Sequence, residues 1–180
     1  MTATLERPQV LAPLGPNARH RLVLVVVAIM AMMVGFGSFV GGIVGVAYTW
    51  DQAAVQDITT PGDATIAEAP VRGPFTMKAQ ADAINKHQLE SAGGLYYAQM
   101  PRQIQDVDQA GNPVFDEARE PVMVSNEARA GWVTATSLIT ALNLGVMAYV
   151  LSAFAIVSGL ALLAIGVGFL YLRRPETQFA

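Results

Sequence analysis

Residues 22 to 48 read LVLVVVAIMAMMVGFGSFVGGIVGVAY, and none of these side chains carries a charge. A second uncharged stretch, ALNLGVMAYVLSAFAIVSGLALLAIGVGFLYL, runs from Ala141 to Leu172. At a rise of about 1.5 Å per residue, roughly 20 apolar residues in a helix cross a hydrocarbon core of about 30 Å. The two stretches therefore predict an integral membrane protein with two transmembrane helices.

The composition agrees with this interpretation. Hydrophobic residues make up 53% of the chain and charged residues 14%, compared with roughly 25% charged residues in a typical soluble domain. The chain has no cysteine, which excludes disulfides, thiolate metal sites and cysteine nucleophiles. Neither apolar stretch contains Asp, Glu, Lys, Arg or His, so a proton or ion pathway within this chain is disfavoured.

We expect an all-α membrane protein whose two spans form an antiparallel hairpin, joined by an approximately 80-residue, partly helical external loop. The second helix is expected to begin before the membrane, because Ser125 and Glu127 are typical of a helix start. Trp132 would then lie in the part of this helix outside the membrane, and we expect it to be an outer anchor or docking residue. The predicted segments are a tail at 1–21, a transmembrane helix at 22–48, a loop at 49–131, a long helix at 132–172 with its span at about 143–170, and a tail at 173–180.

Positive charges near the two spans predict their orientation. Arg19 and Arg21 precede the first span, and Arg173 and Arg174 follow the second, so both termini are expected in the cytoplasm of a plasma-membrane protein. Between residues 50 and 129 the chain has twelve acidic and six basic residues, a net charge of −6. An acidic external loop disfavours nucleic acid as a partner, because both carry negative charge.

Small residues recur at helical spacing in both spans. Glycines repeat every four residues in the first, and a stripe of small residues with spacings of three and four runs along the second. Such stripes let helix backbones approach closely in lipid, where van der Waals contact drives association. The two stripes face each other, or one of them faces another membrane protein or a second copy. The predicted packing residues are Gly37, Gly41 and Gly45, with Gly145, Ala148, Ser152, Ala155 and Gly159.

The loop has one strong helix candidate, Met77 to Ser91. Thr76 is placed to cap it, Gly93 and Gly94 are placed to end it, and Lys86 is spaced to pair with Asp82 and Glu90. The segments before and after this helix are not predicted to be helical. Residues 57–74 are predicted to form an extended connector, and residues 105–121 are predicted to be rich in turns and mobile.

The external segment also carries a motif, "GPFT…AQADAINKH" at residues 73–87, followed by Leu89-Glu90, Gly93-Gly94 and Tyr97-Ala98. This pattern resembles an uncharacterised family of small actinobacterial membrane proteins with two spans and an outside loop. Members often carry an automatic label of aromatic ring-opening dioxygenase, but such enzymes need an iron site of histidines and a carboxylate, which these residues do not supply. The resemblance singles out Phe75, Asp82, Asn85, Lys86, His87 and Glu90 as the external motif.

No constellation of residues predicts catalysis. His87 is the only histidine in the loop, and on a helix only Glu90 lies one turn away as a second ligand, so no metal, cofactor or catalytic residue is predicted. We expect a non-enzymatic accessory or scaffold subunit that binds lipid and other membrane proteins, and a subunit of an actinobacterial respiratory assembly fits that description. The alternatives are a small membrane sensor or envelope-stress protein, and an outer-face enzyme centred on His87.

Overall fold

A computed structural model describes residues 16–172 of the chain, which fall into two compact units. The first unit combines the residues up to Gly42 with those from Phe154 onward, and the second runs from Ile43 to Ala153. Two long helices, α1 (Pro16–Val55) and α3 (Glu127–Leu172), contribute to both units. Residues 1–15 of the predicted tail at 1–21, and all of the predicted tail at 173–180, lie outside the described residues.

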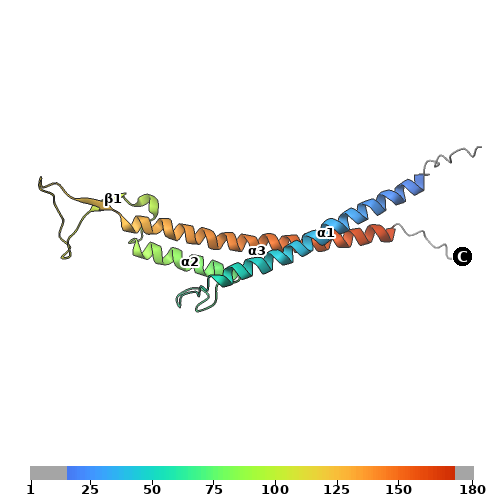
Figure 1. Cartoon of the computed structure of the whole chain (residues 1–180), viewed down its shortest axis with the longest axis horizontal. Helices are drawn as coiled ribbons and strands as arrows, with labels where there is room; N and C mark the ends of the chain where they lie inside the picture. Colours follow the sequence, from blue (N-terminus) through green and yellow to red (C-terminus); the bar gives the residue numbers. More distant parts are fainter. Residues whose placement is uncertain (1–15, 173–180) are drawn as a thin grey trace, which may run out of the picture. The chain divides into compact units, whose positions relative to one another are not determined.

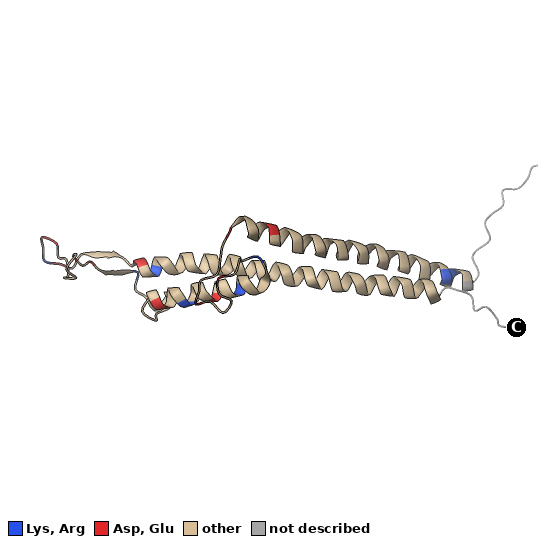
Figure 2. Cartoon of the chain, turned by 90° about the horizontal axis from the view of Figure 1, so that it is seen from below, with Lys and Arg blue, Asp and Glu red and all other residues tan. Residues whose placement is uncertain are grey.

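Both apolar stretches lie within helices, as the sequence predicts. Each helix is long and apolar enough to cross a membrane, and charged positions are confined to the ends of these helices (Figure 2). Large apolar side chains point outward from both, such as Phe36, which is 63% exposed, and Phe154, which is 70% exposed. Water would penalise this much uncovered apolar surface.

The helix boundaries differ from the prediction in detail. α1 begins at Pro16 rather than Leu22 and continues past Tyr48 to Val55. Gln52, Ala53 and Ala54, which follow Asp51, are residues that favour helix. α3 begins outside the apolar stretch, as expected, but its cap is Asn126. The Asn126 side-chain oxygen accepts a hydrogen bond from the backbone N–H of Arg129, at 3.2 Å.

In the first unit the two helices touch through their backbones. A Cβ added to Gly35 would lie 2.8 Å from the carbonyl oxygen of Gly159 and 2.9 Å from the backbone nitrogen of Leu163. One added to Gly166 would lie 3.0 Å from the carbonyl oxygen of Ala28. Gly35 of α1 thus lies beside Gly159 of α3, whereas Ala28, earlier in α1, lies beside Gly166, later in α3. The two segments therefore run antiparallel.

In the second unit a shorter helix, α2 (Pro74–Ser91), lies antiparallel beside the first half of α3 (Figures 1 and 2). It begins three residues before the predicted Met77, since Pro74 occupies the first helical position, where its missing N–H costs nothing. The N-cap is therefore Gly73 rather than the predicted Thr76. Thr76 lies within the first turn, where its hydroxyl accepts a hydrogen bond from the Gly73 N–H at 3.2 Å. Gly93 and Gly94 end it, with φ of +63° and +81°.

Two apolar clusters hold α2 and the loop against α3. One consists of Val71, Met77 and Tyr149, and the Tyr149 hydroxyl donates a hydrogen bond to the Arg72 carbonyl oxygen at 2.6 Å. The other consists of Ala92, Met100 and Trp132. Trp132 is only 5% exposed, and its indole N–H donates to the Leu95 carbonyl oxygen at 2.9 Å. It is therefore a core residue of the loop region rather than a membrane anchor.

The connector at 57–74 folds back on itself instead of extending. The Thr60 N–H donates to the Ala69 carbonyl oxygen at 2.9 Å, and the Val71 N–H donates to the Ile58 carbonyl oxygen at 2.8 Å. These bonds close a loop whose tip carries Gly62 and Asp63. The threonines, prolines and glycine that suggested an extended chain instead supply the turns of this loop.

The segment at 105–121 is rich in turns, as predicted, but it is built on a regular hydrogen-bond pattern. Strands β1 (Gln103–Gln105) and β2 (Met123–Ser125) pair antiparallel after the short 3-10 helix η1 (Tyr97–Gln99). Between them, VDQAGNPV at 107–114 and FDEAREPV at 115–122 form a tandem repeat. The Asp108 and Asp116 side chains each accept backbone N–H bonds two and four residues later, so each repeat forms the same turn.

Burial of Trp132 gives the first prediction. Trp132→Ala should lower the free energy of unfolding of the second unit by about 3–5 kcal/mol, because it removes a large buried ring. Trp132→Phe keeps an aromatic ring and should cost about 1–3 kcal/mol, mainly from the unpaired Leu95 carbonyl. Denaturant unfolding of the full chain in micelles, followed by circular dichroism, measures both.

The neighbouring Val133→Ala is the matched control, since Val133 is 56% exposed and its truncation should change stability by about 0.5 kcal/mol or less. Equal losses for Trp132→Ala and Val133→Ala would contradict the assignment of Trp132 to the core.

Candidate functional site

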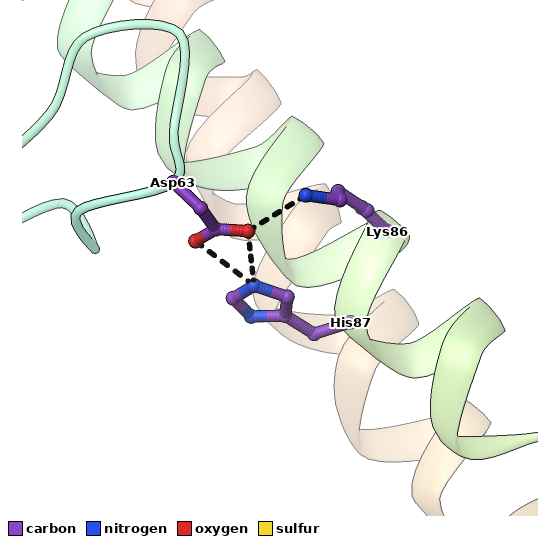
Figure 3. A network of polar contacts seen from close by, with 3 residues as sticks. All are labelled: Asp63, Lys86 and His87. Carbon is purple, nitrogen blue, oxygen red and sulfur yellow. Dashed lines mark hydrogen bonds and ion pairs between the residues drawn. The ribbon is translucent and has the colours of Figure 1, made fainter.

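The external motif contributes two residues to a polar cluster on the outer surface of α2. Lys86 and His87 are adjacent on that helix, and both contact Asp63 at the tip of the folded loop (Figure 3). The Lys86 ammonium lies 2.8 Å from Asp63 Oδ2. The His87 Nε2 lies 2.9 Å from Oδ2 and 3.1 Å from Oδ1 of the same carboxylate. The cluster therefore fastens the loop at 58–72 to α2.

These contacts change the acidity of two groups. The hydrogen bond from Lys86, followed by that from His87, lowers the pKa of Asp63 from 3.8 to about 2. Asp63 in turn raises the pKa of Lys86. Because the folded-state pKa of Asp63 is depressed, its stabilising contribution is present above pH 3.8 and is lost as the pH falls toward about 2. The contribution of Lys86 is complete below pH 10.5 and is lost as the pH rises through its raised pKa.

The structure does not form the predicted ion pairs of Lys86 with Asp82 and Glu90 and forms other ion pairs instead. Asp82 forms an ion pair with Lys78 rather than with Lys86. Lys86 turns to Asp63, while Glu90 raises the pKa of Lys86 only as a lesser, longer-range charge. Sequence reasoning missed Asp63, because it lies 23 residues from Lys86 and no helical spacing links the two. Only the folded loop brings them together.

The other motif residues do not join this cluster. Phe75 is 80% exposed at the start of α2, and Asn85 is exposed on its surface. Ser91 lies one turn after His87, but its hydroxyl donates to the Gln88 carbonyl oxygen at 3.0 Å. Within residues 16–172 no group of three His, Cys, Asp or Glu side chains is arranged to hold a metal ion. The carboxylate–imidazole contact that is present stabilises the loop.

The predicted packing glycines of α1 divide into two sets. A Cβ added to Gly37 or Gly41 would meet no atom within 4 Å in the described part of the chain. A Cβ added to Gly45 would collide with the Ser152 side chain of α3. The structure therefore brings Gly45 and Ser152 together and leaves Gly37 and Gly41 facing outward, where the prediction that they pack on another chain stays open.

The small residues of α3 also differ among themselves. Gly145 makes room for Met77 of α2, since an added Cβ would lie 3.2 Å from the Met77 methyl carbon. Gly159 packs on α1, where an added Cβ would lie 2.6 Å from the Gly35 carbonyl oxygen. Ala148 and Ala155 are only partly buried. The small residues of α3 thus pack against two different helices of the same chain, α1 and α2.

Three packing residues escaped the sequence prediction: Ala28, Gly35 and Gly166. Their signal is a repeat of seven rather than four. Ala28 and Gly35 are seven residues apart in α1, and Gly159 and Gly166 are seven apart in α3. A repeat of seven keeps one face of each helix turned toward its neighbour, as in coiled coils.

No protein-family model, curated protein or solved structure matches this chain. The resemblance of residues 73–98 to the actinobacterial two-span family therefore stays a prediction.

The Asp63 cluster can be tested by titration. Lys86→Gln should raise the pKa of Asp63 from about 2 toward 3.8, because it removes the largest stabilising contact, and His87→Gln should raise it by less. Carboxyl ¹³C chemical shifts of the full chain in micelles, followed against pH, measure this pKa.

Lys78→Gln is the control, since Lys78 pairs with Asp82 on the same helix and should leave the Asp63 titration unchanged. A Lys78→Gln effect as large as that of Lys86→Gln would mean that general surface charge, rather than the direct contact, lowers the pKa.

Proposed function

We propose that the chain is a two-span plasma-membrane protein that acts as an accessory or scaffold subunit without chemistry of its own. The spans form an antiparallel hairpin, both termini lie in the cytoplasm, and α2 with the β1–β2 segment lies outside. Its partner is another membrane protein, and an actinobacterial respiratory assembly is a setting that fits.

One observation carries this proposal: α1 has two glycine faces, and only one is occupied. Gly35 is filled by the backbone of α3, whereas Gly37 and Gly41 have open space around them in the described residues. With 3.6 residues per turn, Gly37 lies about 200° around the helix from Gly35. Gly41 lies about 240° around the helix from Gly35. The face formed by Gly37 and Gly41 therefore points away from that of Gly35, so it is available to another helix.

The physical reason for a partner is the same one that brings the two spans together. In lipid, helices associate through van der Waals contact between backbones, and glycines four residues apart permit the closest approach. Around this face, exposed Met33, Val40 and Val44 supply apolar side chains that can pack on a neighbour. The absence of Asp, Glu, Lys, Arg and His from the apolar stretches is in line with a structural role.

Leucine substitutions test the proposal. Full-length Gly37→Leu/Gly41→Leu should insert into membranes like the wild type but lose its partner, because the new side chains hold the helices apart. A loss of about 1.4 kcal/mol would weaken the complex tenfold. Extraction of membranes at high pH measures insertion, and quantitative mass spectrometry after mild-detergent purification measures the partner.

Two variants complete the experiment. Gly168→Leu also fills open space, but on α3, and should keep the partner. Gly35→Leu should destabilise the packing of the chain's own helices, visible as a lower melting temperature. A wild-type chain that purifies alone as a monomer, or a double variant that keeps its partner, would overturn the proposal.

A further inference from the structure

Phe75 of the external motif is a large apolar residue that lies almost bare in the first turn of α2. It takes no part in the Asp63 cluster, and it belongs to neither apolar cluster of the second unit. Single exposed apolar side chains are common on soluble proteins, so the surroundings of this ring decide what it contacts.

The contacts of Met77, two residues after Phe75, fix the level of the start of α2 along the two long helices. Met77 packs in one cluster with Tyr149 of α3, and Val46 and Ala53 of α1 pack against the same cluster. Figure 1 shows the start of α2 beside α3 and close to the end of α1. Two helical residues rise by about 3 Å, so Phe75 lies at nearly the level of these positions.

Two exposed aromatic residues of α1 share this level. Tyr48 and Trp50 lie between Val46 and Ala53 along the helix, and their side chains are 65% and 47% exposed. The second unit thus presents three aromatic rings at one level, two from α1 and Phe75 from α2. Exposed rings gathered near the end of a transmembrane segment are typical of the aromatic belt at a membrane–water interface.

The length of the second apolar stretch places this level at the outer interface. In the proposed topology Leu172 and the arginines that follow it mark the inner face. Counted back from there, about 20 helical residues cross a hydrocarbon core of about 30 Å and reach the neighbourhood of Ala153. Tyr149 lies about 6 Å farther out along α3. This position falls in the headgroup layer, since the whole bilayer is about 40–45 Å thick.

Charged residues flank the same level in the sequence. Asp51 follows Trp50 in α1, and Arg72 and Lys78 lie on either side of Phe75. The headgroup layer accommodates aromatic rings together with charged groups, whereas the hydrocarbon core disfavours charge. The mixture of residues at this level therefore fits the headgroup layer.

We propose that the first turn of α2 is a third membrane anchor, whose Phe75 ring inserts into the headgroup layer of the outer leaflet beside Tyr48 and Trp50. This inference rests on the proposed membrane insertion, but it does not need a protein partner. The remainder of α2 leaves the membrane, because Gln88 near its end donates to the carbonyl oxygen of Ala128 at the start of α3, at 3.2 Å.

The anchor gives the GPFT part of the external motif a physical role. Pro74 starts the helix at the interface, and the Thr76 hydroxyl accepts from the Gly73 N–H within the first turn. These local contacts hold the Phe75 ring at a fixed depth.

Spin labels that report depth test the anchor. The chain has no cysteine, so a single introduced cysteine carries a nitroxide at a chosen position of the full-length chain in phosphatidylcholine nanodiscs. Oxygen concentrates in lipid and a water-soluble nickel chelate stays in water, so the ratio of their relaxation effects rises with depth. This ratio should be highest for Phe36→Cys, lower and alike for Tyr48→Cys and Phe75→Cys, and lowest for Asn85→Cys.

Asn85 is the matched control, since it is exposed on the same helix and lies about 15 Å farther along it. A second measurement keeps an aromatic ring at position 75. In a Trp50→Phe background the only tryptophan is Trp132, which is buried outside the apolar stretches. Adding Phe75→Trp should introduce fluorescence that lipids brominated near the headgroup quench, whereas adding Asn85→Trp should introduce fluorescence that they do not quench.

The outcomes distinguish this inference from the subunit proposal. A Phe36 label that the nickel chelate reaches means that the chain is not inserted, which overturns both proposals. With Phe36 in lipid, a Phe75 ratio as low as that of Asn85 overturns the anchor alone. A Phe75 label shielded from both reagents also overturns it, because protein rather than lipid then covers the ring. The expected order of depths in Gly37→Leu/Gly41→Leu would support the anchor whether or not a partner is lost.

Discussion

The backbones of α1 and α3 meet where Gly35 faces Gly159, and this contact leaves no space for a side chain on either residue. Apolar surface gains little from burial when the surroundings are themselves apolar, so two helices in hydrocarbon are held mainly by how closely they approach. Small residues therefore decide the pairing of the first unit. The same device operates in the second, where Gly45 receives Ser152 and Gly145 receives Met77.

Outside the apolar stretches a different force acts. There α3 continues as a helix and provides the surface on which α2 and the loop fold, through buried side chains such as Trp132. Tyr149, which lies within the second apolar stretch, extends this surface into it. Both rings also donate a hydrogen bond to a loop carbonyl oxygen. A small domain with few large buried residues depends strongly on each of them, since little other apolar area is available. The Asp63 cluster adds a surface connection between the loop and α2, and exposed ion pairs of this kind contribute modestly.

The sequence by itself determined the helical character of both apolar stretches, the start of α3 before the second stretch, and the presence of the helix α2 with its end just before Gly93 and Gly94. These features follow from local rules of charge, spacing and capping, which neighbouring residues satisfy on their own. Only the tertiary structure decided that Gly35 and Gly159 touch, that Trp132 is buried and that Lys86 pairs with Asp63. These contacts join residues far apart in the chain, and closing a loop between distant residues depends on the whole fold rather than on local preference.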